Sequence, residues 1–202
     1  ESYLQDTLRQ DTTAKANFKL PARISVNFFH KLNEKIDLLM DYTFIETSII
    51  DNVRVNFSNR INKKTGETVV QGAAGVDTKW KDSFKVSIGA NYHLNEKITL
   101  KTGFQFDKTP VPSPEFRHPG LPDSDRFMYS IGLNYKVKDN LTIDGAYSYV
   151  FLEDSLSNYR DRCRVTMRED TGASCTGNGG SFTGKFSDTS IQVLSLQLNQ
   201  KF

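Results

Sequence analysis

The sequence predicts an all-β protein: an antiparallel up-and-down transmembrane β-barrel, of which this chain supplies about seven strands. Two patterns carry the prediction. Apolar residues alternate with polar ones along several stretches, and short connections alternate with long ones between those stretches. Because successive side chains of a strand point to opposite faces, such alternation indicates strands with one apolar face. In addition, the 202 residues contain no apolar run of the roughly 20 residues that a membrane-spanning helix needs.

The alternation is clearest in the middle of the chain. Between residues 80 and 93, Trp80, Phe84 and Ile88 share one face, and Lys81 and Lys85 share the other. The same pattern predicts strands at 98–107, 126–137 and 141–151. Further strands are expected at 22–29, at 36–56 with a bulge near 48–51, and at 186–202, which makes seven in all.

The connections between these strands alternate strictly in length. Short ones are expected near 32–35, 94–97 and 138–140, and long ones at 58–79, 108–125 and 153–185. An outer-membrane barrel with tight periplasmic turns and long external loops has this order. The short connections also repeat a phrase, KLNEKIDL, HLNEKITL and KVKDNLTI, in which a polar turn enters an alternating strand. The repeat indicates hairpins.

An odd number of strands is unexpected for a closed bacterial barrel, because single-chain barrels have even numbers from eight upward. An open sheet in lipid would also leave edge backbone groups unpaired. We therefore expect the native protein to carry an amino-terminal half of the same barrel before Glu1. The alternative is a further strand between residues 3 and 19, which would give eight.

The alternating pattern alone also fits a soluble barrel, which buries its apolar face and exposes its charges. Three features favour a membrane barrel with lipid as its outer partner. The strands have about ten residues or more, which suffices to cross a bilayer when tilted. Aromatic residues gather near strand ends, as in an interfacial girdle. The last strand carries Leu194, Leu196 and Leu198 and ends at Phe202, which resembles the terminal strand of bacterial outer-membrane proteins.

Composition and motifs exclude several other classes of function. Lys plus Arg number 26 against 24 Asp plus Glu, so no strongly basic surface points to nucleic acid. The three histidines are scattered, and neither HExxH, GxSxG nor a metal-spaced cysteine pair occurs. The GNGG stretch at 177–180 lies in a loop with no helix expected after it. We expect no enzyme and no cofactor.

Cys163 and Cys175 both lie in a Gly- and Ser-rich polar segment. An even count in one external loop favours a disulfide between them, as suits an oxidising compartment. Two free thiols in the loop are the alternative.

Four passages resemble the FadL family of outer-membrane transporters for long-chain fatty acids and hydrocarbons. They are LPARISVNFFHKLNEKIDLLMDYTF from Leu20, WKDSFKVSIGANYHLNEKITLKTGFQFD from Trp80, KTPVPSPEFRHPGLPDSDRF from Lys108, and GKFSDTSIQVLSLQLNQKF at the end. The resemblance implies a 14-stranded barrel in the bacterial outer membrane, with this chain as its carboxy-terminal half. The family's amino-terminal hatch and its lateral opening would lie outside this sequence.

The resemblance also suggests candidate ligand residues. It implies that Asp107, which has lumen parity at the external end of its strand, belongs to a hydrophobic-ligand pocket together with basic residues. Lys79, Lys81 and Lys85 are the candidate partners for a fatty-acid carboxylate, because an ammonium binds it as a point charge. The alternatives are that Asp107 stabilises the following loop and that the lysines solvate the lumen or pair with hatch carboxylates. Asp123, Asp125 and Arg126 are expected to tie the Pro-rich loop to the barrel wall.

The predicted function is passive uptake of long hydrophobic molecules, such as fatty acids, which bind within the barrel and pass sideways into the membrane. Transfer of acyl chain out of water, at about 0.8 kcal/mol per methylene, would drive it. Two alternatives stay open: a general diffusion porin, and an adhesin-like barrel that acts through its external loops.

Overall fold

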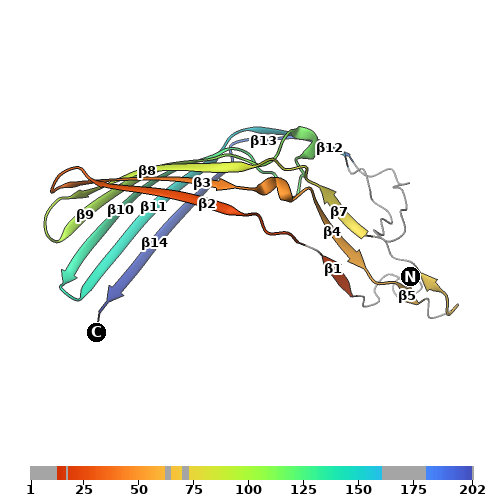
Figure 1. Ribbon diagram of the computed structural model, residues 1–202, viewed down its shortest axis with the longest axis horizontal. Helices are drawn as coiled ribbons and strands as arrows, with labels where there is room; N and C mark the ends of the chain where they lie inside the picture. The colour runs from red at the N-terminus through yellow and green to blue at the C-terminus, as the bar shows by residue number, and fades with distance from the viewer. Residues whose placement is uncertain (1–12, 17, 62–64, 70–72, 161–180, 202) are drawn as a thin grey trace.

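The main body of the protein is one curved antiparallel sheet (Figure 1). The computed structural model describes residues 13–16, 18–61, 65–69, 73–160 and 181–201. Seven strands form the sheet in the order β14-β11-β10-β9-β8-β3-β2. They are β2 (Arg23–Lys31), β3 (Ile36–Ile45), β8 (Ser83–His93), β9 (Ile98–Asp107), β10 (Arg126–Lys138), β11 (Leu141–Leu152) and β14 (Ser190–Gln200). The predicted wall of about seven up-and-down strands is confirmed.

The short turn between β2 and β3 and the one between β8 and β9 are built in the same way. The Asn33 side-chain oxygen accepts hydrogen bonds from the backbone amides of Lys35 at 2.8 Å and Ile36 at 3.0 Å. Asn95 accepts the two equivalent bonds, both at 2.9 Å. An asparagine that bonds to the backbone two and three residues on closes a tight turn. The repeated LNEK phrase thus encodes a repeated turn.

One face of the sheet carries a continuous row of aromatic rings. Ring centroids lie 6.2 Å apart for Tyr42 and Phe84, 5.9 Å for Phe84 and Phe106, 5.1 Å for Phe106 and Phe127, and 4.9 Å for Phe127 and Phe151. This aromatic row crosses β3, β8, β9, β10 and β11 near their external ends. Such spacings suit offset or tilted ring contacts. The opposite face, called here the lumen face, carries the polar residues of the same strands.

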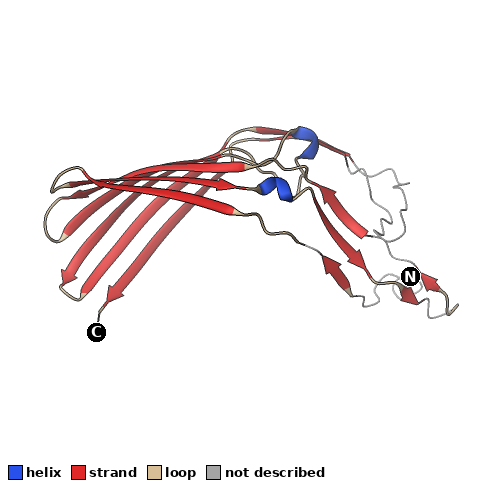
Figure 2. Ribbon diagram, viewed as in Figure 1, coloured by secondary structure: helices blue, strands red, loops and turns tan. Residues whose placement is uncertain are grey.

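The sheet has no protein core beneath it. Within the described residues, only Val111 and Tyr159 are buried apolar side chains, and both lie outside the seven strands. On the outer face, Ile24 and Ile131 are 64% and 63% exposed, and Leu194 is 84% exposed. Figure 2 shows a single layer of strands with no helix packed against it. A sheet whose apolar face stays uncovered is suited to lipid as its surroundings.

Among the described residues, no helix has the length and hydropathy to cross a membrane.

The prediction of one bulged strand over residues 36–56 is wrong. β3 ends at Ile45, a 3-10 turn η1 (Thr47–Ile49) follows, and β4 (Asn52–Phe57) leaves the main sheet. The Thr47 hydroxyl donates to the carbonyl of Lys81, and the Ser48 amide donates to the Asp82 carboxylate at 3.0 Å. These polar bonds redirect the chain, and alternation in the sequence does not reveal such a bend.

Beyond η1 the chain forms smaller external sheets. β4 pairs with β1 (Ala14–Ala16) and β7 (Ala73–Asp77), while β5 (Arg60–Ile61) pairs with β6 (Thr68–Val69). β1 lies outside the main sheet, so the described part of 3–19 adds no eighth strand to it.

The other two long connections also contain structure. The 108–125 loop holds a 3-10 turn, η2 (Pro114–Phe116). The 153–185 segment holds the hairpin of β12 (Ser155–Arg160) and β13 (Ser181–Phe186). The predicted strand at 186–202 starts later, at Ser190. Cys163 and Cys175 lie outside the described residues, so their pairing stays a prediction.

Candidate ligand pocket at the external end of the lumen face

Strand register places three charged residues side by side. Asp107, the last residue of β9, lies opposite Lys85 of β8 and opposite Arg126, the first residue of β10. Their sequence neighbours Phe106 and Phe127 belong to the aromatic row, so these three side chains project to the lumen face. Alternation on neighbouring strands therefore builds a charged cluster from residues far apart in the sequence.

This cluster forms part of the wall of a pocket with a volume of about 600 Å³. Its charged lining consists of Lys85, Lys108 and Arg126 with Asp107 and Asp123, three cations against two carboxylates. The rest of the lining is apolar or small: Ile45, Thr47, Trp80, Ser83, Pro110, Gly120, Leu121 and Pro122. A pocket with a few charged groups on an otherwise apolar wall suits a ligand with one charged end and an apolar body.

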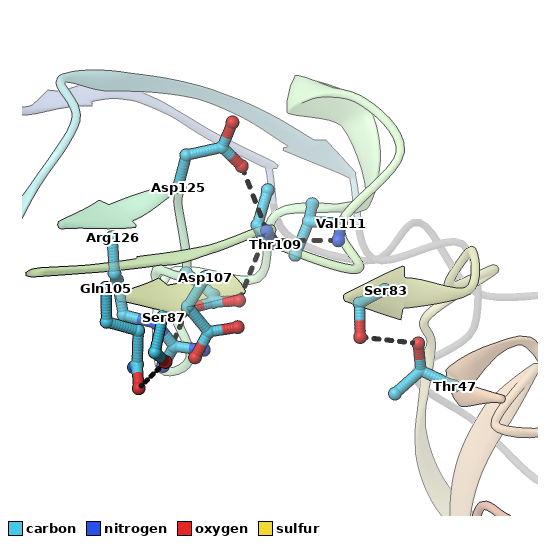
Figure 3. A network of polar contacts seen from close by, with 10 residues as sticks. Thr47, Ser83, Ser87, Gln105, Asp107, Thr109, Val111, Asp125 and Arg126 are labelled. Carbon is cyan, nitrogen blue, oxygen red and sulfur yellow. Dashed lines mark hydrogen bonds and ion pairs between the residues drawn. The ribbon is translucent and has the colours of Figure 1, made fainter. Parts of the chain in front are cut away.

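Within the pocket, Arg126 is the group that joins the carboxylates. Its Nη2 atom lies 3.1 Å from Oδ2 of Asp107 (Figure 3). Its Nη1 atom lies 3.5 Å from Oδ1 of Asp123. Arg126 Nε is buried without a hydrogen-bond partner. Among the residues that the structure describes, no carboxylate lies within ion-pair distance of Lys85. The Lys85 ammonium is therefore available to an anionic ligand.

The structure does not bring the other two predicted lysines into this pocket. Lys79 Nζ lies 2.8 Å from a carboxylate oxygen of Asp51, and Lys79 is not among the lining residues. Lys81 is held by backbone hydrogen bonds and is not among the lining residues. Its amide donates to the Pro110 carbonyl at 2.9 Å, and its own carbonyl accepts from the Thr47 hydroxyl. Of the four predicted ligand residues, the geometry groups Asp107 with Lys85.

Arg126 is the residue that the sequence reasoning assigned only to loop anchoring. Arg126 has lumen parity and begins the strand after the 108–125 loop, directly opposite Asp107. This position was the signal in the sequence for a place beside the ligand residues. Parity alone could not show that its guanidinium lines a pocket, because that depends on the path of the loop.

The two other aspartates hold that loop in place over the pocket. Asp125 accepts hydrogen bonds from the Thr109 amide at 2.9 Å and from Lys108 Nζ at 2.6 Å. Asp123 accepts one from the Thr109 hydroxyl at 2.7 Å. These bonds join the two ends of the loop, and the Asp123–Arg126 pair ties it to β10 of the barrel wall, as the sequence predicts. The same loop supplies Pro110, Gly120, Leu121 and Pro122 to the pocket.

Arg117 fastens the β12–β13 hairpin to the same loop. The Arg117 side chain, only 8% exposed, donates from Nε to the Asp123 carbonyl at 2.8 Å and from Nη1 to the Leu156 carbonyl. In return, the buried Ser157 hydroxyl donates to the Arg117 carbonyl at 2.6 Å. Burial lowers the pKa of the Arg117 guanidinium from its ordinary value, and the nearby Asp123 and Asp125 oppose this shift. We call this set of bonds the Arg117 clamp.

The described residues also contain one histidine–tyrosine contact and no metal-binding cluster. Histidine and tyrosine meet at the hairpin, where the rings of His118 and Tyr159 lie 4.8 Å apart, edge to face. In the described part of the chain, no three His, Cys, Asp or Glu residues are grouped so as to hold a metal ion.

A single layer of amphipathic strands with one uncovered apolar face, one charged face and a pocket at one end is the pattern of the wall of an outer-membrane β-barrel. Residues 3–202 match the family described as outer membrane protein transport protein (OMPP1/FadL/TodX). The chain belongs to this family, whose members are found in the bacterial outer membrane.

Individual relatives agree with this assignment. Outer membrane protein P1 of Haemophilus influenzae is 28% identical over 145 residues, which are 72% of this chain and 29% of the relative. The long-chain fatty acid transport protein of Escherichia coli K12 is 33% identical over 86 residues, 43% of this chain and 18% of the relative. The chain thus spans less than a third of the length of these relatives.

Solved structures share the fold. A FadL homologue from Pseudomonas aeruginosa superposes with a TM-score of 0.69 at 22% identity, covering 93% of this chain and 37% of the homologue. The toluene transporter TodX from P. putida gives a TM-score of 0.54 at 19% identity, covering 71% and 31%. Of these, the E. coli relative is named a transporter of long-chain fatty acids and TodX a transporter of toluene.

Proposed function

We propose that the complete protein carries long-chain fatty acids or similar hydrophobic acids across the outer membrane, and that the pocket at Lys85 binds their head group. Support comes from two sources. The family is one of outer-membrane transport proteins. The E. coli relative is named a long-chain fatty acid transport protein.

The observation that carries the proposal is the unpaired Lys85 ammonium beside an apolar lining. Asp107 and Asp123 are both engaged by Arg126, whereas no carboxylate oxygen of the described residues lies within 4.0 Å of the Lys85 ammonium, although Asp107 is its cross-strand neighbour. A carboxylate ligand would supply the missing partner, and a charge-assisted hydrogen bond of this kind is short and strong. The acyl chain would contact apolar residues such as Trp80 and Leu121.

Asp107 has a positioning role in this proposal. A carboxylate repels the ligand's own carboxylate, so Asp107 does not attract it directly. Its bond to Arg126 instead fixes the guanidinium at the pocket wall.

The remainder of the route involves partners outside this chain. The ligand would leave the barrel sideways into the outer-membrane lipid, through an opening formed with the amino-terminal half of the same barrel. The gain on moving each methylene from water to lipid, about 0.8 kcal/mol, would drive this step without a cofactor.

The test is uptake of labelled oleate by cells that lack their own transporter and express the complete protein. We expect Lys85→Gln to lower the apparent affinity about tenfold, since a hydrogen bond to a charged group contributes about 1.5–3 kcal/mol. Asp107→Ala should also weaken uptake, because Arg126 loses its nearer partner. Lys79→Gln is the matched control, a cation already paired outside the pocket. Equal behaviour of the two lysine variants would remove the head-group assignment.

A diffusion porin is the second candidate, because charged side chains line the lumen face away from the pocket. Lys101 Nζ, for example, lies 3.1 Å from Asp144, a pair that a hydrated channel would accommodate. If the same cells took up no oleate while small sugars leaked in, the porin would be the better description. An adhesin-like role is separated by exchanging the β12–β13 hairpin for another, which should leave uptake intact if transport is the function.

A further inference from the structure

The Pro-rich loop contains a turn at residues 118–121 that is closed by a histidine side chain. His118 Nδ1 accepts a hydrogen bond from the Gly120 amide at 3.0 Å. Asn33 and Asn95 accept the same kind of bond from the amide two residues on, at 2.8 Å and 2.9 Å. His118 thus takes the part in its loop that asparagine takes in the short turns of the wall, where the side chain holds the backbone.

This turn supplies part of the pocket at Lys85. Gly120, Leu121 and Pro122 line the pocket, whereas His118 is not among the lining residues. The Leu121 amide donates to the His118 carbonyl at 2.9 Å. A Cβ atom at Gly120 would meet Cε1 and Nδ1 of His118 at 3.1 Å, so the imidazole ring lies against Gly120. Displacement of this ring would therefore move the backbone that forms the lining.

The bond to Gly120 requires a neutral imidazole ring. A backbone N–H only donates, so Nδ1 of His118 offers its lone pair and the ring proton is on Nε2. An imidazolium ring carries a proton on each nitrogen and accepts no hydrogen bond. Histidine changes between these two forms near neutral pH. Protonation of His118 therefore removes the bond and sets two N–H groups against each other.

The surroundings of His118 include one facing titratable ring and several charged groups. The Tyr159 ring of β12 lies edge to face with His118, with centroids 4.8 Å apart. The charged groups on the neighbouring elements are Glu115 in η2, Arg160 on β12, Lys185 on β13, and Arg117 and Asp123 in the loop itself. Arg117 is engaged in the Arg117 clamp, Asp123 with Arg126, and Lys185 with Asp154. The bond between His118 and Gly120 is thus the one in this turn that depends directly on the charge of the imidazole.

We propose that His118 is a pH-sensitive switch of the pocket loop. The neutral ring closes the 118–121 turn and holds Gly120 and Leu121 in the pocket lining. The protonated ring releases the turn, so that acid pH loosens the lining and weakens ligand binding. The opening of the turn does not depend on what the pocket binds, whereas its effect on an anionic ligand rests on the proposed function of Lys85.

Hydrogen exchange of the complete protein in nanodiscs measures the turn directly. Pro119 and Pro122 have no amide, so Gly120 and Leu121 carry the two amides between them, and both are bonded to His118. Protection factors remove the pH dependence of the intrinsic exchange rate. We expect them to fall about fivefold between about pH 8 and about pH 5, the factor that one neutral hydrogen bond contributes. Unchanged protection would overturn the proposal.

Three variants test whether His118 is the titrating group. His118→Asn keeps an acceptor for the amide two residues on and does not titrate, so it should show high protection at both pH values. His118→Phe keeps an aromatic ring against Tyr159 but has no acceptor, so protection should be low at both. His93→Gln is the matched control, because His93 ends β8 at the opposite end of the main sheet. A pH response that survives in His118→Asn, or disappears in His93→Gln, would overturn the proposal.

Binding of dodecyl sulfonate, which stays anionic over this range, measures the effect on the pocket. We expect about fivefold weaker binding to the wild type at the acid pH and equal binding to His118→Asn at both. Lys85→Gln should weaken binding at both pH values. If it does not, while the turn still opens in acid, the head-group proposal fails and the switch in the turn stands. If the turn opens but a probe that depends on Lys85 binds equally or more tightly in acid, the control of binding by His118 is refuted.

Discussion

Replacing Arg117 by methionine should release the β12–β13 hairpin from the pocket loop. The substitution keeps a long apolar stem and removes two hydrogen bonds from a charged donor, those to the carbonyls of Asp123 and Leu156. Such bonds contribute about 1.5–3 kcal/mol each, but water replaces part of that once the contact opens. A net loss of about 3 kcal/mol corresponds to roughly a hundredfold increase in local opening. The bond from Ser157 to the Arg117 backbone carbonyl stays available, so the hairpin should loosen without unfolding.

Hydrogen exchange of the complete protein in nanodiscs measures this opening. Amides of residues 155–160 should exchange about a hundredfold faster in Arg117→Met, while amides within β9 and β10 keep the wild-type rate. Arg117→Lys should fall between the two, because one ammonium cannot replace a forked guanidinium at two carbonyls. Lys185→Met is the matched control: it breaks a pair with Asp154 in the same hairpin whose side chains are 57% and 51% exposed, and it should change little. Unchanged exchange at 155–160 in Arg117→Met would refute the clamp.

Three further predictions concern the wall, its turns and the hairpin. Gly89→Ala should lower the stability of the barrel by about 1–2 kcal/mol, because the new methyl group would press on the Thr102 carbonyl. Gly145→Ala is the control, since a methyl group there meets nothing within 4 Å. Gel mobility of heated samples measures both, and equal melting would count against a tight approach of β8 and β9 at Gly89. Asn33→Ala and Asn95→Ala should each lower the urea midpoint, because two hydrogen bonds of about 0.5–1.5 kcal/mol are lost per turn, with Glu34→Ala as the control. The Lys185 ammonium lowers the pKa of Asp154 below 3.8, and Asp154 raises the pKa of Lys185 above 10.5. The contribution of this pair to the stability of the hairpin is therefore constant between those two values. It is lost as pH falls through the lowered carboxyl pKa, and also as pH rises through the raised ammonium pKa. Because both side chains are more than half exposed, this contribution is small. Proteolysis of the hairpin should therefore be flat across this range and rise only slightly at its acid and alkaline ends, and Asp154→Asn should abolish both small steps.

The strands of the main sheet could be predicted because each contains its own alternation. Residues 98–107 were expected as a strand and form β9 over Ile98–Asp107, since apolar and polar residues alternate there with Thr102 as the one polar residue on the apolar face. The path of the chain outside the sheet could not be predicted in this way. η1 depends on Thr47 and Ser48 meeting residues 81 and 82, more than 30 positions away, and no local pattern encodes such a contact.

At the candidate site, too, residues within strands could be placed from the sequence and residues just outside strands could not. Parity placed Asp107 and Lys85 on the lumen face, and the register then made them neighbours. Lys81 shared that parity, but it precedes β8, and its backbone is held by Pro110 and Thr47. Lys79 has a backbone φ of 46° and turns to Asp51. Alternation determines direction only where a strand exists, so residues just outside a strand cannot be assigned to a face.

The aromatic row also indicates how deep in the membrane the charged pocket lies. Aromatic rings at the ends of barrel strands lie at the boundary between hydrocarbon and head groups. Phe84, Phe106 and Phe127 are each adjacent in sequence to a charged residue of the pocket, so the rings on one side of the wall and the charges on the other stand at the same height. A fatty acid bound at Lys85 would therefore have its carboxylate level with the lipid head groups outside, and its tail would run parallel to the lipid tails a single strand's thickness away. It would lie in the orientation of a membrane lipid before it entered the membrane.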